Sequence, residues 1–363
     1  MTIPIADPDI GEAEREGVVS VLESGYIASG DVVTAFEDEF ADYCGTERAV
    51  ATANGTAALH AVCEALDVEG DSVVTTPFSF VATANSIRLA GGEPVFADID
   101  PETYNLDPDA VEAILRERED VAAIMPVHLY GLPADMRRFR ELADEHDVAL
   151  IEDAAQAHGA TVDGRPVGSL GDVACFSFYP TKNMTTGEGG MVTTDDPEIE
   201  AGVRQFINHG RDGSEAYAHV SVGHNLRLTN IAAALGRAQL DRLPTFTEAR
   251  QENARRLTEG LADAPVETPT TPDGREHAYH QYTVRCSDRN ALRSTLEERE
   301  IGNKVYYPTL IHDLEAYEGY SAETPAASRA TEEVLSLPVH PNVSTDDIDR
   351  IVEAISNTPT NHV

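Results

Sequence analysis

The chain has 363 residues, of which 41% are apolar and 25% charged, a composition ordinary for a globular protein with a large core. At about 150 residues per domain, this length suggests two domains. Its 64 acidic residues far outnumber the 26 lysines and arginines, so the formal net charge is −38. A chain this acidic lacks the basic face that nucleic acid requires and is repelled by anionic lipid, so neither nucleic acid nor a membrane is an expected partner.

The acidic residues are dispersed among apolar periodic segments, which is not typical of a disordered chain. Concentrated salt screens charge over roughly 3 Å at 1 M, so such a surface is tolerated there. Only Lys182 and Lys304 are lysines, and every other basic residue is an arginine. The composition therefore predicts a halophilic protein, although a GC-rich genome would produce the same shortage of lysine.

Cysteines and termini carry no targeting or metal signal. Cys44, Cys63, Cys175 and Cys286 lie far apart, without a C-x-x-C pair or a histidine at zinc spacing, which predicts reduced thiols and no metal site. The first residues lack a basic stretch followed by an apolar core, and the longest apolar run, 121–127, is too short to span a bilayer. We therefore expect a soluble cytoplasmic protein.

Short apolar runs alternate with helical patterns between residues 48 and 240, which predicts a mostly parallel sheet with helices on both faces. The expected strands are 49–53, 72–76, 94–98, 121–127, 148–152, 173–178 and 190–194, and the expected helices are 56–66, 80–89 and 134–146. The last two strands follow each other too closely for a helix to lie between them. They predict an antiparallel pair, and hence a mixed sheet.

The pattern changes after Asn230, where a segment rich in small apolar residues ends at Leu243-Pro244. The elements expected beyond this break are a helix at 245–262, a strand at 279–285, and helices at 288–300 and 345–356. We therefore expect a large domain over residues 1–243 and a smaller α+β domain over residues 244–363.

Lys182 follows the expected strand 173–178 and precedes Gly187-Glu188-Gly189-Gly190. A lysine at the end of a buried strand, before a glycine-rich turn, is well placed to form a Schiff base with a carbonyl cofactor. The alternative is an ordinary solvated loop lysine. Because the chain has only two lysines, an ordinary solvated lysine is a weaker explanation here than in most proteins.

Asp153 follows the expected strand 148–152, and ligands of open α/β sheets bind at the carboxyl ends of strands. A carboxylate there can pair with a protonated pyridine nitrogen; at roughly 4 Å and an effective dielectric of about 20, the attraction is about 4 kcal/mol. The alternative is an aspartate that caps the following helix.

Two further patterns are weak when taken alone. Asn54-Gly55-Thr56 stands between a strand and a helix, where free N–H groups bind phosphate, but the same residues make an ordinary turn and cap. Phe80 could stack on an aromatic cofactor or belong to the core. A phosphate-binding helix start, a strand-end aspartate and a strand-end lysine together match what pyridoxal 5′-phosphate (PLP) requires: an anchor, a partner for its ring nitrogen and an amine.

With these residues in place, the sequence resembles the DegT/DnrJ/EryC1/StrS sugar aminotransferases, which are fold type I PLP enzymes with an α/β large domain and a smaller C-terminal domain. The resemblance covers about residues 4–355. The segments that carry it are 54–60 (NGTAALH), 76–83 (TPFSFVAT), 126–131 (PVHLYG), 151–159 (IEDAAQAHG), 176–183 (FSFYPTKN) and 187–190 (GEGG).

The resemblance implies a role for each matching residue. Lys182 corresponds to the Schiff-base lysine and Asp153 to the partner of the pyridine nitrogen, and these are the expected catalytic residues. The other expected contacts with the cofactor are Gln156 at its phenolic oxygen, Phe80 on its ring, and Gly55, Thr56 and Ser177 at its phosphate. Asn225 corresponds to an asparagine that reaches the phosphate from the neighbouring subunit, which implies a homodimer with shared active sites.

The implied activity is transfer of an amino group from L-glutamate to a nucleotide-linked keto-sugar, with a 4-keto-6-deoxy sugar for surface glycan synthesis favoured. The sequence departs from the commoner pattern at Tyr26 and at Tyr306-Tyr307-Pro308, in regions that face the substrate, so the identity of the sugar stays open. Two alternatives remain: a PLP-dependent sugar dehydratase, whose relatives carry histidine where Lys182 stands, and a PLP-binding regulatory protein without catalysis.

Overall fold

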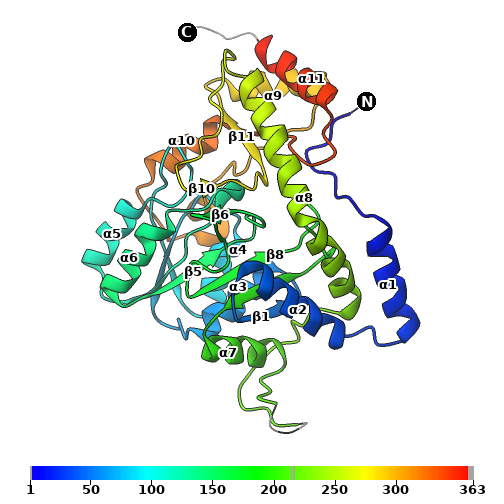
Figure 1. Cartoon of the computed structure of the whole chain (residues 1–363). Coiled ribbons are helices and arrows are strands. Elements are labelled where there is room, and N and C mark those ends of the chain that lie inside the picture. The colour runs from blue at the N-terminus through cyan, green and yellow to red at the C-terminus, as the bar shows by residue number, and fades with distance from the viewer. Residues whose placement is uncertain (1, 214, 216, 359–363) are drawn as a thin grey trace.

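The computed structural model describes residues 2–213, 215 and 217–358. A seven-stranded sheet lies at its centre (Figure 1). Its strands are β1 (Arg48–Thr52), β2 (Ser72–Thr75), β3 (Glu93–Phe96), β4 (Val121–Ile124), β5 (Ala149–Asp153), β8 (Val173–Ser177) and β9 (Gly190–Thr194). They lie side by side in the order β1-β9-β8-β5-β4-β2-β3.

The sheet is mixed, as expected. Strands β3, β2, β4, β5 and β8 pair in parallel, whereas β9 pairs antiparallel with both β1 and β8. The register of β8 and β9 runs from Val173 opposite Thr194 to Ser177 opposite Gly190. Because β5 and β8 are parallel neighbours, with Asp153 opposite Cys175, their carboxyl ends lie at the same edge of the sheet.

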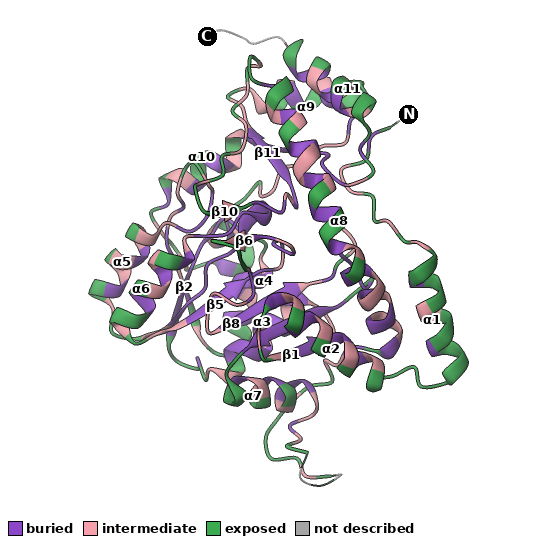
Figure 2. Cartoon of the chain, viewed as in Figure 1, coloured by how far each residue is buried: buried purple, intermediate pink, exposed green. Residues whose placement is uncertain are grey.

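Helices cover both faces of this sheet. In the first part of the chain these are α1 (Glu12–Ser24), α2 (Asp31–Cys44), α3 (Gly55–Ala65), α4 (Ala82–Leu89), α5 (Pro108–Glu117), α6 (Met136–His146) and α7 (Pro197–Ile207). Successive side chains of a strand point to opposite faces, so Val50 and Val192 share a core with α3 and α7, while Ala51 and Met191 share one with α2. Because helices pack on both faces of the sheet, its strands are almost wholly buried (Figure 2).

The C-terminal part adds a second core above the sheet (Figure 1). Its elements are α8 (Asn230–Gly260), β11 (Tyr282–Arg285), α9 (Arg289–Glu298), α10 (Pro325–Glu333), β12 (Val334–Leu337) and α11 (Thr345–Ser356). Strands β11 and β12 pair antiparallel. The minor elements are a small sheet of β6 (Thr161–Val162), β7 (Arg165–Pro166) and β10 (Arg275–Glu276), and 3-10 turns at Leu129–Gly131, Ile311–Asp313 and Glu315–Tyr317.

The expected break at Pro244 is wrong, because α8 continues through it. Proline removes one helical hydrogen bond and usually kinks or ends a helix. Here Leu243 packs in the core between α2 and the sheet, and Leu257 packs in the C-terminal core. Tertiary contacts therefore hold both halves of α8 in place. The division into domains at 243/244 stays a prediction.

Within the described ranges, no helix combines the length and apolar character needed to cross a bilayer.

Candidate active site

A cavity of about 820 Å³ lies at the carboxyl ends of β5 and β8, beside the N-terminus of α3. This is the edge where ligands of parallel α/β sheets bind. Seven of the eight residues expected to act or to hold a cofactor line it: Gly55, Thr56, Phe80, Asp153, Gln156, Ser177 and Lys182. Residues from four separate stretches of sequence therefore meet around one space.

The N-terminus of α3 forms an anion cradle at one end of the cavity. The Asn54 side chain caps the helix by accepting from the N–H of Ala57 at 2.9 Å, which leaves the N–H groups of Gly55 and Thr56 facing outward at the helix start. A Cβ atom on Gly55 would meet the Cβ of Ser177 at 2.7 Å, so only glycine fits beside β8. Such a backbone is suited to a phosphate group.

Asp153 ends β5 and is buried. Its Oδ2 accepts a 2.7 Å hydrogen bond from the Thr83 hydroxyl and its Oδ1 accepts one of 3.2 Å from the N–H of Ala155. Burial raises the pKa of the Asp153 carboxyl, and these hydrogen bonds together with the charge of Lys182 oppose that rise. The side chain is fixed in place and retains spare acceptor capacity for a protonated ring nitrogen.

Lys182 lies five residues beyond Ser177, the last residue of β8, in a turn where its N–H donates to the carbonyl of Tyr179 at 2.8 Å. Its side chain lines the cavity. Removal from water lowers the pKa of the Lys182 amine to about 8, while the charge of Asp153 acts in the opposite direction. An amine with this pKa is partly neutral near neutral pH, so it can attack a carbonyl or carry a proton.

Phe80 and Gln156 complete the middle of the cavity. Phe80 is 57% exposed, which is unusual for a phenylalanine and argues against a role in the core. The Oε1 atom of Gln156 accepts from the N–H of Tyr130 at 2.9 Å, and its Nε2 donates to the Tyr307 hydroxyl at 3.3 Å. The amide is thereby held in one orientation, with the exposed ring of Phe80 lining the same space.

Asn225 is the expected residue that the cavity of its own chain does not include. It is exposed, and its neighbour Leu226 lines the cavity. Among the described residues that line this space, Lys182 is the single lysine or arginine.

Sequence reasoning missed Thr83 and His280 as site residues. Thr83 lies within the resembling segment 76–83, which was a usable signal, and its hydroxyl lies 2.8 Å from that of Ser79, which precedes α4. His280 comes from the C-terminal part of the chain and no local pattern marks it. Tertiary contacts alone bring it to the cavity.

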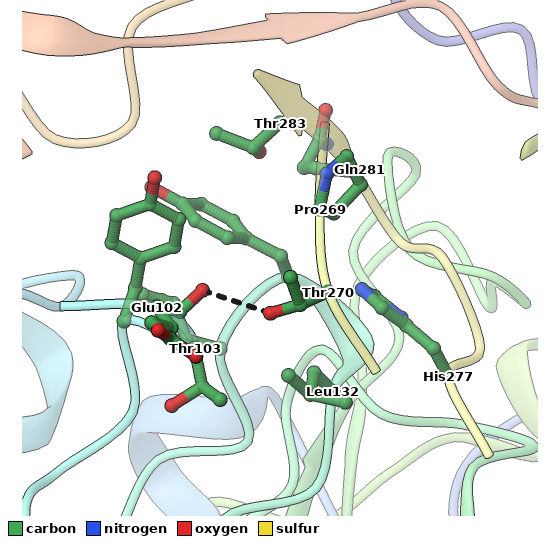
Figure 3. A pocket seen from close by; sticks show the side chains of 11 residues that line it. Glu102, Thr103, Leu132, Pro269, Thr270, His277, Gln281 and Thr283 are labelled. Atoms are coloured by element: carbon green, nitrogen blue, oxygen red, sulfur yellow. Dashed lines mark hydrogen bonds between the residues drawn. The ribbon is translucent and has the colours of Figure 1, made fainter. Parts of the chain in front are cut away.

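A second, much smaller hollow is lined in part by Leu129 and Tyr130 of the 3-10 turn (Figure 3). Thr270 donates a hydrogen bond of 3.3 Å to the carbonyl of Glu102 across its wall. Its volume is about 10 Å³, enough for one water molecule and far too small for a substrate.

The larger cavity fits PLP on the chemistry of its donors. Its glycine-lined helix start suits the phosphate, Asp153 suits the ring nitrogen, and Lys182 offers the amine that a carbonyl cofactor requires. Phe80 presents an exposed aromatic face to the same space. The four groups belong to one continuous site rather than to separate clusters.

Comparison with known proteins gives the same answer. A profile of the DegT/DnrJ/EryC1/StrS aminotransferase family matches residues 8–356. A "Pleiotropic regulatory protein" of Geobacillus stearothermophilus is 41% identical over 345 residues, 93% of this chain and 91% of its own. A UDP-N-acetyl-3-dehydro-alpha-D-glucosamine 3-aminotransferase of Acidithiobacillus ferrooxidans is 37% identical over 94% of this chain and 92% of its own.

Solved structures agree in fold and cofactor. A DegT DnrJ EryC1 StrS aminotransferase from Brucella abortus superposes with a TM-score of 0.91 at 35% identity over 94% of each chain. The PLP form of a protein described as "Putative sugar aminotransferase Spr1654", from Streptococcus pneumoniae, superposes with a TM-score of 0.93 at 29% identity, over 99% of this chain and 98% of that one. The resemblance read from the sequence is confirmed, and the chain belongs to the DegT/DnrJ/EryC1/StrS family of PLP-dependent aminotransferases.

Proposed function

We propose that this aminotransferase moves an amino group from L-glutamate to a nucleotide-linked 4-keto-6-deoxy sugar for surface glycan synthesis, in the cytoplasm. Nucleotide sugars are supported by relatives whose names specify UDP-, GDP- and dTDP-linked sugars, at 37% to 38% identity. A spore coat polysaccharide biosynthesis protein, SpsC of Bacillus subtilis, is 38% identical, which supports the glycan role. The observation that carries the proposal is the meeting of Lys182, Asp153 and the start of α3 around one cavity.

In this proposal PLP, when bound, supplies an electron-accepting ring and a carbon that carries the amino group between substrates. With PLP bound, the Lys182 amine would take the proton from the donor's α-carbon and deliver it to the cofactor carbon that holds the amino group, a role suited to its lowered pKa. Asp153 holds a proton on the ring nitrogen. The N–H groups at the start of α3 anchor the phosphate, which keeps the reacting carbon close to the Lys182 amine.

A homodimer with shared active sites is the proposed assembly. Asn225 is exposed and lies outside the cavity of its own chain, as expected of a residue that serves a neighbour. The anionic cofactor and nucleotide also need more donors than one chain offers, since Lys182 is the single cation among the described lining residues. A second copy supplying Asn225 would add to them.

Two alternatives to the aminotransferase activity can be tested directly. The name of the Geobacillus relative favours a regulatory protein that binds PLP without turnover. A sugar dehydratase of the same scaffold carries histidine at the position of Lys182, so the lysine argues against that activity. Release of 2-oxoglutarate from L-glutamate separates the aminotransferase from both.

The decisive experiment is a visible absorption spectrum of the purified holoenzyme in concentrated potassium chloride, before and after addition of L-glutamate. We expect the absorption band of lysine-bound PLP to bleach, with one equivalent of 2-oxoglutarate released. The Lys182→Ala variant should still bind PLP but release none. A band that glutamate leaves unchanged would contradict the proposed donor.

The same preparation then tests the sugar. The bleached enzyme is mixed with nucleotide-linked 4-keto-6-deoxy and 3-keto sugars in turn. Return of the original band with the 4-keto sugar supports the proposal, whereas return only with the 3-keto sugar transfers the assignment to that class, which the Acidithiobacillus relative's name specifies.

A further inference from the structure

Tyr307, in the segment between α9 and α10, lines the active-site cavity. The backbone of this segment is held by the Tyr130 hydroxyl, which donates a hydrogen bond to the carbonyl of Tyr306. The Tyr307 ring packs beside Phe78 and Phe80, with ring centroids 6.2 and 6.4 Å away. Its position is therefore fixed, and the residue stays partly exposed at the cavity wall.

The hydrogen bonds of Gln156 leave the hydroxyl proton of Tyr307 unused. Oε1 of Gln156 accepts from the N–H of Tyr130 at 2.9 Å, so the amide nitrogen is the atom that lies 3.3 Å from the Tyr307 oxygen. An amide nitrogen only donates, and the Tyr307 oxygen is therefore the acceptor in this bond. Within residues 2–213, 215 and 217–358, the Tyr307 hydroxyl makes no other hydrogen bond. Its O–H is thus a donor that remains available to a ligand in the cavity.

This donor is neutral. Burial, followed by the nearby charge of Asp153, raises the pKa of the Tyr307 hydroxyl above its usual value, against the opposing effect of the hydrogen bond from Gln156. The group therefore keeps its proton at neutral pH. A neutral hydroxyl can donate to an anionic carboxylate or to a neutral hydroxyl oxygen, whereas a guanidinium at this place would favour the anion.

An aminotransferase binds two unlike substrates in one site, one after the other. In L-glutamate, the α-carboxylate oxygens lie two bonds from the carbon that carries the amino group. In a 4-keto sugar, the hydroxyl oxygen on the neighbouring carbon also lies two bonds from the carbon that receives the amino group. Both reacting carbons must come to the same place beside Lys182, so these oxygens come within reach of the same part of the cavity wall.

We propose that the Tyr307 hydroxyl donates to both oxygens in turn: to the α-carboxylate of the amino donor, and to the hydroxyl beside the keto carbon of the sugar. This inference rests on the proposed function and deepens it, because it names a specificity-determining residue that the two half-reactions share. It also defines the sugar further. Keto-sugars that carry a hydroxyl on the neighbouring carbon are bound in preference to analogues that lack it, since the analogue leaves the donor unpaired.

The first test combines a variant with a substrate analogue. Wild type and Tyr307→Phe are loaded with pyridoxamine 5′-phosphate and mixed with the nucleotide-linked 4-keto-6-deoxy sugar or with its 3-deoxy analogue, and formation of the PLP band is followed. We expect the apparent dissociation constant of the parent sugar to rise about 5- to 10-fold in Tyr307→Phe. Removal of the sugar hydroxyl should weaken binding to the wild type by a similar factor and to the variant by less than about twofold. Equal weakening in both proteins would overturn the contact with the sugar.

The second test measures binding of a carboxylate without chemistry. Glutarate, an unreactive dicarboxylate, is titrated into each PLP holoenzyme by calorimetry at constant ionic strength. Tyr307→Phe should bind glutarate about 10-fold or more weakly than the wild type, because a hydrogen bond to a charged group is lost. Equal affinities would overturn the contact with the carboxylate, and a loss confined to one of the two substrates would overturn the shared donor.

Tyr104→Phe is the matched control. Tyr104 also packs beside Phe78, with ring centroids 6.4 Å apart, but it lines the small hollow and not the active-site cavity. This variant should bind glutarate and the sugar as the wild type does, and melting temperatures and PLP content verify that each variant is folded. If glutarate binding depends on Tyr307 but the wild type releases no 2-oxoglutarate from glutamate, the proposed function fails while the carboxylate contact stands.

Discussion

The hydroxyl of Thr83 donates a 2.7 Å hydrogen bond to Oδ2 of Asp153. Because this bond uses the hydroxyl proton of Thr83, the Ser79 hydroxyl, 2.8 Å from the Thr83 oxygen, must donate to Thr83 in turn. The two hydroxyls form a buried chain that ends on the carboxylate. Thr83 thereby lowers the pKa of Asp153 against the effect of burial and fixes the plane of the carboxyl group.

We expect Thr83→Val to weaken PLP binding about 10-fold, because a hydrogen bond to a buried charged group is lost. The dissociation constant can be measured by fluorescence, together with the pH dependence of the visible PLP band, which reports the state of the ring nitrogen. Thr83→Ser should restore both properties.

Ser86→Ala is the matched control for this variant. Ser86 is equally buried on α4, but its hydroxyl donates to the backbone carbonyl of Thr83 at 2.8 Å and not to Asp153. If Thr83→Val and Ser86→Ala bind PLP equally well, Thr83 has no special role toward Asp153.

The ionisation of Lys182 predicts a pH profile for loading the cofactor. Below its pKa of about 8 the amine is mostly protonated and cannot attack a carbonyl. The rate of covalent attachment of PLP to cofactor-free protein should therefore rise about tenfold per pH unit below pH 8 and level off above it. Since the charge of Asp153 raises the pKa of Lys182, Asp153→Asn should move the plateau to lower pH. Stopped-flow absorbance measures both profiles; a plateau reached only near pH 10 would contradict the assigned pKa.

Shared active sites predict complementation between two inactive variants. Lys182→Ala and Asn225→Asp homodimers should both be inactive or nearly so. If each site takes Lys182 from one chain and Asn225 from the other, a mixed dimer contains one intact site, and random mixing should restore roughly a quarter of wild-type activity. Co-expression with two affinity tags isolates the mixed dimer. No recovery in that species would mean that Lys182 and Asn225 do not come from different chains in one active site, which would contradict the shared-site proposal.

Two buried histidines predict a loss of stability in acid. Burial lowers the pKa of His158 and of His277 to about 3, against about 6.5 in an unfolded chain. Between these values the unfolded state binds protons that the folded state does not, so the free energy of unfolding should fall as pH drops below about 6.5, by up to about 1.4 kcal/mol per pH unit for each histidine. Guanidinium unfolding between pH 7.5 and 5 measures the slope. His277→Asn should reduce it, and an unchanged slope would show that other groups control acid stability.

The surface charge leads us to expect stabilisation by salt. With 64 acidic and 26 basic residues, the folded chain is strained by self-repulsion that screening relieves. The melting temperature should rise steadily with potassium chloride toward molar concentration. A maximum in dilute buffer would contradict halophilic adaptation and leave genome composition as the source of the lysine shortage.

Local sequence patterns predicted the parts of the fold that have local causes. Apolar runs marked the strands of the sheet to within a few residues, and the short spacing before Gly190 revealed the antiparallel pair of β8 and β9. Helices α5 and α7 were missed although Asp107-Pro108 and Asp196-Pro197 cap them, a start signal present in the sequence.

Other features depended on contacts that no local pattern contains. Pro244 is an ordinary helix breaker in sequence and is overridden by packing on both sides of it. Lys182 and Asp153 were identifiable because they stand at strand ends, where the fold class itself places ligands. His280 was not, because its position follows from the way the 277–281 segment docks on the turn at Tyr130 and Gly131.

The uninterrupted course of α8 has a consequence for protein engineering. At 31 residues the helix is about 46 Å long, and its first half packs in the core shared by α2 and the sheet while its second half supports the C-terminal core (Figure 1). A chimera that exchanged C-terminal parts between relatives at residue 243 or 244 would join two half-helices from different parents, with mismatched packing on both sides. A crossover after Leu261, where α8 has ended, would transplant the wall that carries His280 while leaving the helix whole.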